Sequence, residues 1–388
     1  MQRLKQLSRL AALAVALTAL AWQPSQAADE VTVGALLPLS GVTGPNGQAV
    51  LDGMTMAADD INAKGGLLSR QIKLIAKDDE STPAIGVSRA NELVADGVSA
   101  VLGGWNSTVT LAVQPILARA EIIDITAVAK ADAVLDAGGN PYAIRINSSN
   151  SQDGNIVARY VLEKLGAKRV AFMTQNDTYG EGAQKVIETE MTKLGKPYEV
   201  VVTEKFPFKQ MDFRVALTNV KSANPDAVIV INGSQSAGMP ALIQQYVEAG
   251  VTAQFVGSVG GLLDTVFPIA GAAVNGMVTA DVYIPDLPPY SQIEANNAFV
   301  KAYEAKYGKK PQKMAALGYA AMQVWAKGVE KAGDFDRVKV AEAIRGHKID
   351  GTIFGDVTFS GNGQMEAKLV LYKVSDYATG KLEPIALD

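Results

Sequence analysis

The sequence predicts an α/β protein of two lobes, each built around a doubly wound, mostly parallel sheet. Short apolar runs rich in β-branched residues alternate with stretches of helical periodicity from Asp29 onward. After a polar stretch at 145–151 the alternation starts again and gives a second series of similar size. The turns between the segments are short, which is typical of repeated βα units that form parallel sheets.

The first series contains the elements of one lobe. The expected strands are 31–37, 72–76, 98–102 and 122–125, and the expected helices are 48–64, 83–96 and 109–120. In the helix at 48–64, Met54, Ala57 and Ile61 recur at helical spacing, and Gly65 follows its end. A turn containing glycine and proline, 38–47, separates this helix from the first strand.

The second series contains the other lobe and a long C-terminal part. The expected strands are 169–173, 199–204, 227–231, 255–257 and 277–280, and the expected helices are 152–165, 179–194, 213–222 and 237–249. Three further helices between 292 and 345 precede late strands at 357–359 and 369–374. These helices are too many for the second lobe alone, so we expect the chain to return to the first lobe and cross back at its end. The predicted lobes are 29–147 with 280–355, and 148–279 with 356–388.

The first 27 residues have the pattern of a cleaved signal peptide. Arg3, Lys5 and Arg9 precede an apolar run at 10–21, and small residues follow at 25–27. No later apolar run is long enough to span a bilayer, which predicts a soluble, exported mature chain. The sequence has no cysteine, and its 40 acidic and 36 basic residues form no basic block after the signal peptide, so nucleic acid is not an expected partner.

The residues needed for common enzyme classes are missing. His347 is the one histidine, and no histidine–carboxylate cluster has the spacing of a metal site. The segment 256–260 is similar to a nucleophile elbow, but Val256 stands where its first glycine belongs. There is no phosphate-binding loop or dinucleotide fingerprint. We therefore expect no catalytic residue, no metal and no cofactor.

A strand-to-helix turn at 103–108 is the strongest candidate site. In open α/β sheets, ligands bind at the carboxyl ends of strands, where this turn lies. Ser107 and Thr108 can cap the following helix, whose free N–H groups suit a carboxylate, and Trp105 offers a flat apolar face beside Asn106. A capped helix with a surface tryptophan and no ligand is an equally good interpretation of this stretch alone.

Other polar residues follow the other expected strands. The further candidates are Asn46, Lys130, Tyr179, Ser234, Ser258 and Asp281. Lys130 is placed where an anion could reach it, although a surface lysine at a helix start is an equal alternative. Tyr179 could be an ordinary turn residue, and Asp281 a polar group of a loop. If the strand ends of the two lobes face each other, they enclose a cleft for a small molecule.

The sequence resembles the periplasmic substrate-binding proteins of the Leu/Ile/Val-binding type, which serve ABC importers. The resemblance is carried by VGALLPLSG at 33–41, ADDINAKGG at 58–66, VLG at 101–103 and DTYGEG at 177–182, and it covers the whole mature chain. It implies a bilobal type I periplasmic binding protein fold with a three-stranded hinge that closes around a ligand.

The resemblance also implies roles for several residues. Ser107 and the backbone around it would hold the ligand carboxylate, with Val128 and Lys130 on the next turn, and Tyr179 would close over the ligand. The chain departs from the family where a glutamate that pairs with the ligand ammonium is replaced by 258–261 (SVGG). Asn46 replaces a tyrosine, and Lys130 replaces a small hydroxyl residue. These departures favour an organic acid without an ammonium group over a neutral α-amino acid.

The expected function is therefore that of a periplasmic protein that captures a small carboxylate-bearing ligand and delivers it to an inner-membrane ABC permease. We expect it to act as a monomer. Two alternatives stay open from the sequence. A ligand sensor of the same fold would signal to a receptor, and an exported hydrolase would require Ser258 as its nucleophile.

Overall fold

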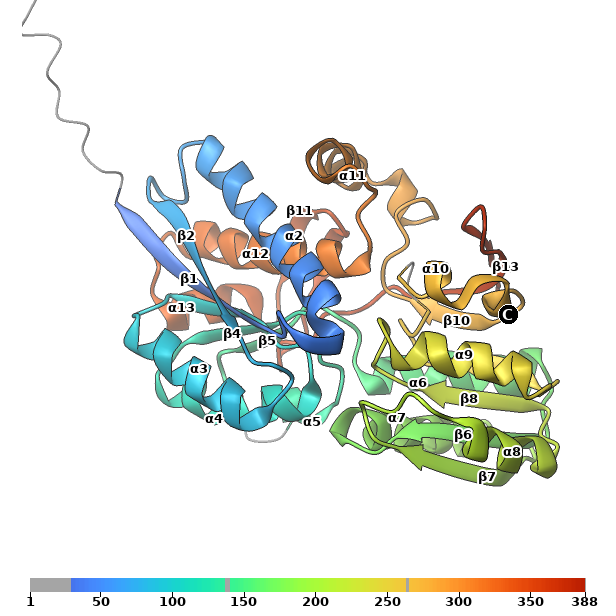
Figure 1. The fold of residues 1–388 in the computed structure, drawn as a ribbon. Helices are drawn as coiled ribbons and strands as arrows, with labels where there is room; N and C mark the ends of the chain where they lie inside the picture. Colours follow the sequence, from blue (N-terminus) through green and yellow to red (C-terminus); the bar gives the residue numbers. More distant parts are fainter. Residues whose placement is uncertain (1–28, 137–139, 263–264, 388) are drawn as a thin grey trace, which may run out of the picture.

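The computed structural model describes residues 29–136, 140–262 and 265–387. The predicted signal peptide, 1–27, lies outside the described residues. Within the described part, no helix is long and apolar enough to cross a membrane. Figure 1 shows two lobes side by side, each with helices on both faces of a sheet.

The first lobe contains a five-stranded parallel sheet with the order β2-β1-β3-β4-β5. Its strands are β1 (Glu30–Leu37), β2 (Gln71–Asp78), β3 (Ala100–Gly103), β4 (Ile123–Thr126) and β5 (Ala143–Arg145). Its helices are α2 (Gly44–Ala63), α3 (Pro83–Ala95), α4 (Ser107–Arg119), α5 (Ala133–Asp136), α12 (Lys313–Ala332) and α13 (Arg337–Ile344). The number of late helices predicted that the chain returns to this lobe, and α12 packs against α2.

Close contact between α2 and α12 requires glycine. A Cβ atom on Gly53 would lie 1.9 Å from the carbonyl oxygen of Ala315, and one on Gly318 would lie 1.9 Å from that of Val50. The two backbones therefore touch without intervening side chains, which fixes the position of the N-terminus of α12 relative to the sheet. On the opposite face of the sheet, α3 and α4 pack through a separate apolar cluster that includes Leu93.

The second lobe contains a seven-stranded sheet with the order β14-β13-β10-β9-β8-β6-β7. Its strands are β6 (Arg169–Gln175), β7 (Glu199–Phe206), β8 (Ala227–Ile231), β9 (Gln254–Gly257), β10 (Val278–Asp281), β13 (Val370–Asp376) and β14 (Lys381–Pro384). The last two strands pair antiparallel and the others parallel. Helices α6 (Asn150–Arg159) and α7 (Thr178–Lys193) cover one face, and α8 (Arg214–Ala223) and α9 (Gly238–Glu248) cover the other.

One further helix, α11 (Glu294–Tyr307), and several short elements complete the chain. The short elements are α10 (Phe267–Ala270), the 3-10 turns η1 (Gly41–Thr43), η3 (Gly271–Val274) and η4 (Tyr290–Gln292), the π-helical turn η2 (Tyr160–Lys164), and the antiparallel pair β11 (Lys348–Thr352) and β12 (Gly355–Thr358). Helix α11 lies near the first lobe, since Lys306 Nζ is 2.7 Å from Asp59 Oδ2 on α2.

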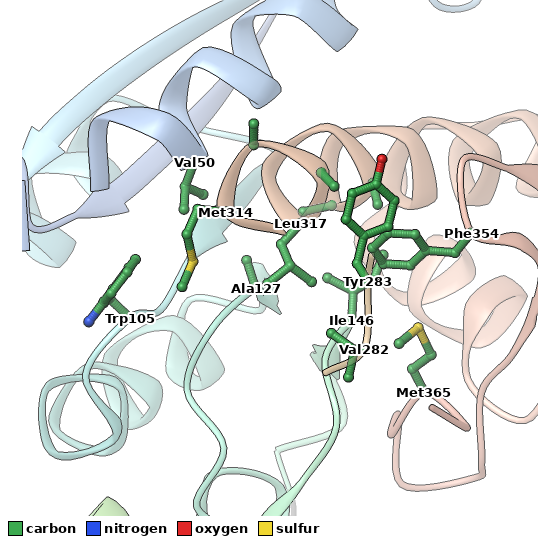
Figure 2. Close-up of a cluster of buried hydrophobic side chains, with 14 of the residues drawn as sticks. Val50, Trp105, Ala127, Ile146, Val282, Tyr283, Met314, Leu317, Phe354 and Met365 are labelled. Atoms are coloured by element: carbon green, nitrogen blue, oxygen red, sulfur yellow. The ribbon is translucent and has the colours of Figure 1, made fainter. Parts of the chain in front are cut away.

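Three segments connect the lobes, and the positions of two differ from those expected. Strand β10 belongs to the second sheet through Asp281, so the second crossing follows 281 instead of lying at 280. Strand β12 pairs with β11, which contacts α12, so the third crossing follows β12 instead of starting at 356. The three crossings pack together through Ile146, Val282 and Met365, which lie in one apolar cluster (Figure 2).

Candidate functional site

A cleft lies between the lobes, at the carboxyl ends of the parallel strands of both sheets. It is lined by Trp105, Asn106, Ser107, Val128, Ala129, Lys130, Asn147, Gln175, Tyr179, Phe208, Gly233, Gln235, Val259, Gly260, Lys313 and Met314. Six predicted site residues line this cleft. Tyr179 comes from the second lobe, and the other five come from the first lobe: Trp105, Asn106, Ser107, Val128 and Lys130.

The turn after β3 brings the N-terminus of α4 to the cleft. Gly103 and Gly104 have φ angles of +142° and +64°, a backbone region that favours glycine. The predicted capping by Ser107 and Thr108 is wrong, because Asn106 caps the helix instead. Its Oδ1 accepts hydrogen bonds from the backbone N–H groups of Thr108 (2.9 Å) and Val109 (3.4 Å). The cap leaves Ser107 as the first helical residue, facing the cleft.

The Ser107 hydroxyl is oriented for donation. Its Oγ accepts a hydrogen bond of 3.2 Å from the backbone N–H of Ala131, and the side chain is buried. Since that bond uses an oxygen lone pair, the hydroxyl hydrogen is available to an acceptor in the cleft. The same cleft is lined by the ring of Trp105 and the side chain of Met314, the second residue of α12; Figure 2 shows both side chains.

Lys130 lines the cleft, but it does not present a free cation to it. Its ammonium donates to Asp153 Oδ2 (2.7 Å), Ser148 Oγ (2.9 Å) and the carbonyl oxygen of Val259 (3.1 Å). These three bonds use the three ammonium hydrogens, which corrects the expectation that Lys130 would bind the ligand carboxylate. Burial raises the pKa of Asp153, and the attraction of Lys130 opposes that shift.

The buried Arg145 supports the same loop from behind. Its guanidinium donates to the carbonyl oxygens of Lys130 (2.9 Å) and Ala131 (2.8 Å). Arg145 also connects the first and third crossings. Its backbone N–H donates to the carbonyl oxygen of Gly363, and its own carbonyl oxygen accepts from the backbone N–H of Met365. The loop that positions Ser107 and Lys130 is therefore anchored directly to the hinge.

A second buried lysine in the cleft wall was missed by the sequence analysis. Lys313 Nζ lies 3.1 Å from Asp281 Oδ1 and 3.4 Å from the carbonyl oxygen of Gly260. Burial lowers the pKa of Lys313, and Asp281 opposes that shift. Asp281 was predicted to contact the ligand, but it lies behind Lys313 and does not line the cleft. A lysine at the first position of a helix is unfavourable, because its charge lies at the positive end of the helix dipole. This unusual placement is the sequence feature that could have identified Lys313.

Tyr179 and two glutamines form the second-lobe wall. Tyr179 OH lies 3.0 Å from Ser258 Oγ, and burial raises the pKa of this tyrosine. Gln175 Oε1 accepts from the backbone N–H of Gly233 at 2.9 Å. Gln235 has a buried amide oxygen with no hydrogen-bond partner among the residues that the structure describes. The glutamines were not predicted, because nothing in the local sequence distinguishes them from other polar residues of loops.

Besides Asp281, three predicted residues lie outside the cleft lining. Asn46 is buried in the first turn of α2 and not in a loop. Ser234 accepts a hydrogen bond of 3.1 Å from the backbone N–H of Gly238 at the start of α9. Ser258 lies behind Tyr179, its hydroxyl hydrogen-bonded to that phenol, which is a poor base at neutral pH. This geometry does not support the hydrolase alternative.

The lobes also touch each other across the cleft. Thr108 Oγ1 of α4 donates to Thr178 Oγ1 of α7 at 3.1 Å. Together with the bonds from Lys130 and Lys313 to the carbonyl groups of Val259 and Gly260, this contact holds the two walls together.

Comparison with known proteins gives matches along almost the entire chain. The family described as periplasmic binding protein matches residues 30–381. The Leu/Ile/Val-binding protein BraC3 of Rhizobium johnstonii is 30% identical over 363 residues, which are 93% of this chain and 95% of the relative. The Leu/Ile/Val-binding protein of Escherichia coli (strain K12) is 27% identical over 355 residues, 92% of this chain and 93% of the relative.

Two solved structures with bound ligands are similar in fold. The branched-chain amino acid transporter substrate-binding protein LivJ from Streptococcus pneumoniae, in complex with isoleucine, has a TM-score of 0.81 and 26% identity. The match covers 92% of this chain and 99% of that one. An ABC transporter solute-binding protein from R. palustris, in complex with benzoate, has a TM-score of 0.82 and 27% identity, with coverage of 92% and 96%.

Proposed function

This chain belongs to the periplasmic binding protein family, and we propose that it captures a small carboxylate-bearing ligand for an ABC importer and delivers it to an inner-membrane permease. The similar structures hold isoleucine in one case and benzoate in the other, and both ligands carry a carboxylate. The proposal includes export of the chain to the periplasm after removal of residues 1–27.

The observation that carries the proposal is the position of Ser107 at the N-terminus of α4. A helix N-terminus concentrates positive potential, and the Ser107 hydroxyl adds a donor. In a buried cleft, hydrogen bonds to a carboxylate are stronger than those to a neutral group. Trp105 and Met314 provide an apolar surface for the carbon skeleton, and Tyr179 contacts it from the other lobe.

Delivery requires that the ligand favour one arrangement of the lobes. A ligand that touches Ser107 and Tyr179 at once contacts both lobes, so it stabilises the closed arrangement by its extra contacts there. Hinge closure around the ligand is the general behaviour of periplasmic binding proteins. The three adjacent crossings, which share the cluster of Ile146, Val282 and Met365, are the segments about which the lobes would rotate.

Native mass spectrometry of the exported protein tests the proposal. The protein would be purified from the periplasm without denaturation, and the released small molecule identified. We expect a mature chain that begins near Ala28 or Asp29 and one bound molecule with a carboxylate. A thermal-shift screen of amino acids and organic acids should show stabilisation by the same compound. A co-purified ligand without a carboxylate, or stabilisation by uncharged sugars alone, would contradict the proposal.

A further inference from the structure

We propose that Lys313 determines the class of ligand. Its ammonium occupies the place in the cleft wall where the α-ammonium of an amino acid would otherwise be neutralised. The cleft therefore selects carboxylic acids that lack this group and carry a hydrogen, hydroxyl or oxo oxygen there. This inference rests on the proposed function, because it takes the cleft as the ligand site.

The position of the ammonium is fixed from several sides. Lys313 begins α12 in the first lobe, and its side chain is 3% exposed, against 4% for its partner Asp281. A Cβ atom built on Gly260 would lie 2.0 Å from Lys313 Nζ, so only glycine leaves room for the ammonium there. Gly260 also has a φ angle of +78°, which favours the same residue.

The carboxylates that could neutralise a ligand ammonium are each already paired with a lysine. The carbonyl of Val259 accepts from Lys130 and that of Gly260 from Lys313, while Asp153 and Asp281 each pair with one of these lysines. Among the described residues that line the cleft, none is aspartate or glutamate.

An α-ammonium placed in this wall would lie beside two lysine ammonium groups and would find no unpaired carboxylate among the described residues to neutralise it. The amide oxygen of Gln235 is free, but it is neutral and cannot cancel a buried positive charge. An organic acid brings a negative charge only, which the N-terminus of α4 and Ser107 accept. Lys313 makes two hydrogen bonds to the described residues, so its third hydrogen can donate to an oxo or hydroxyl oxygen of such a ligand.

Pairs of ligands that differ only at the α-position test this inference. Isothermal titration calorimetry would compare leucine with 4-methyl-2-oxopentanoate, and phenylalanine with phenylpyruvate. The proteins would be the mature wild-type chain, Lys313→Ala, and the double variant Lys313→Ala/Asp281→Asn. For the wild type we expect at least one oxo acid to bind at least about 100-fold more tightly than its amino acid.

The variants separate charge from space. Lys313→Ala leaves the Asp281 carboxylate unpaired beside a new cavity, so the preference should shift at least about tenfold toward the amino acid. The double variant has the same cavity without the charge and should show no such shift. Circular dichroism and retained binding of the oxo acid would establish that each variant is folded.

Several results would overturn the inference. An amino acid that binds the wild type as tightly as its oxo acid contradicts it, and this comparison needs no variant. An unchanged preference in folded Lys313→Ala also contradicts it. In both cases a carboxylate still binds, so the proposed function stands. If neither member of either pair binds, the inference fails in this form, and the co-purified ligand decides whether the proposed function fails too.

Discussion

Lys130 and Asp153 form a buried ion pair of 2.7 Å that joins the two lobes. Lys130 follows β4 of the first lobe, and Asp153 lies on α6 of the second. Their side chains are 6% and 10% exposed, and the same ammonium donates to the carbonyl oxygen of Val259. The pair therefore connects the two lobes at the wall of the cleft. Its two charges largely cancel each other before a ligand binds.

We expect Lys130→Met to destabilise the protein by about 3–5 kcal/mol, because it leaves Asp153 buried without its partner. Urea denaturation at pH 7 would measure this change. The double variant Lys130→Met/Asp153→Asn should recover much of the loss, since it buries no unpaired charge. Equal stability of the single and double variants would contradict the account of this pair.

Ser107→Ala should weaken binding of the co-purified carboxylate about 10- to 100-fold, because it removes a donor to a charged group. Calorimetry would measure the dissociation constant. Ser151→Ala is the matched control, since its hydroxyl bonds to Asp132 and does not line the cleft. If the two variants bind the ligand equally well, Ser107 does not contact it.

At position 179, the ring should matter more than the hydroxyl. Tyr179→Phe removes the bond to Ser258 and should cost about 1 kcal/mol of binding or less, whereas Tyr179→Ala also removes the apolar contact and should cost more. Ser258→Ala should match the phenylalanine variant. A large loss in Tyr179→Phe with none in Ser258→Ala would show that the phenol itself binds the ligand.

Asp124 should make stability depend on pH. It is buried in β4 with Gln114 Nε2 at 3.2 Å, and burial raises its pKa from 3.8 to about 7. The folded chain therefore holds a proton here that the unfolded chain releases above pH 4. The stabilisation that this proton confers is full below pH 4 and is lost as the pH rises to about 7.

Asp124→Asn tests this dependence with little change in shape. The variant should be more stable than the wild type at pH 8, by up to a few kcal/mol, and the advantage should disappear near pH 4. Chemical denaturation at several pH values would measure the difference. An offset that is the same at every pH would show that Asp124 does not titrate in this range.

The alternation of elements could be predicted from the sequence because each strand and helix has its own apolar period. The start of helix α2 could not be predicted in this way. Pro45 and the glycines around it indicate a turn, yet proline is compatible with the first turn of a helix, and α2 begins at Gly44. The third crossing was placed too early because strand β11 was not predicted, so its hairpin with β12, which contacts α12 of the first lobe, was missed.

The site was predicted only in part, because some of its residues have a local sequence pattern and others are placed only by tertiary contacts. The turn at Ser107 has a local pattern, so it was found. Tyr179 was found from its place after a predicted strand, and the resemblance added its role. The partner of Lys130 was not found, because Asp153 reaches it only in the folded chain. Lys313 was missed because its place in the cleft is set by the packing of α12 on α2, far from the local sequence.

The most direct test of the central claim is a calorimetric titration of the co-purified ligand beside its primary carboxamide. If the N-terminus of α4 and Ser107 hold a carboxylate, the acid binds with one molecule per chain, and the amide binds about 100-fold more weakly. Equal affinity of the acid and the amide would contradict the account.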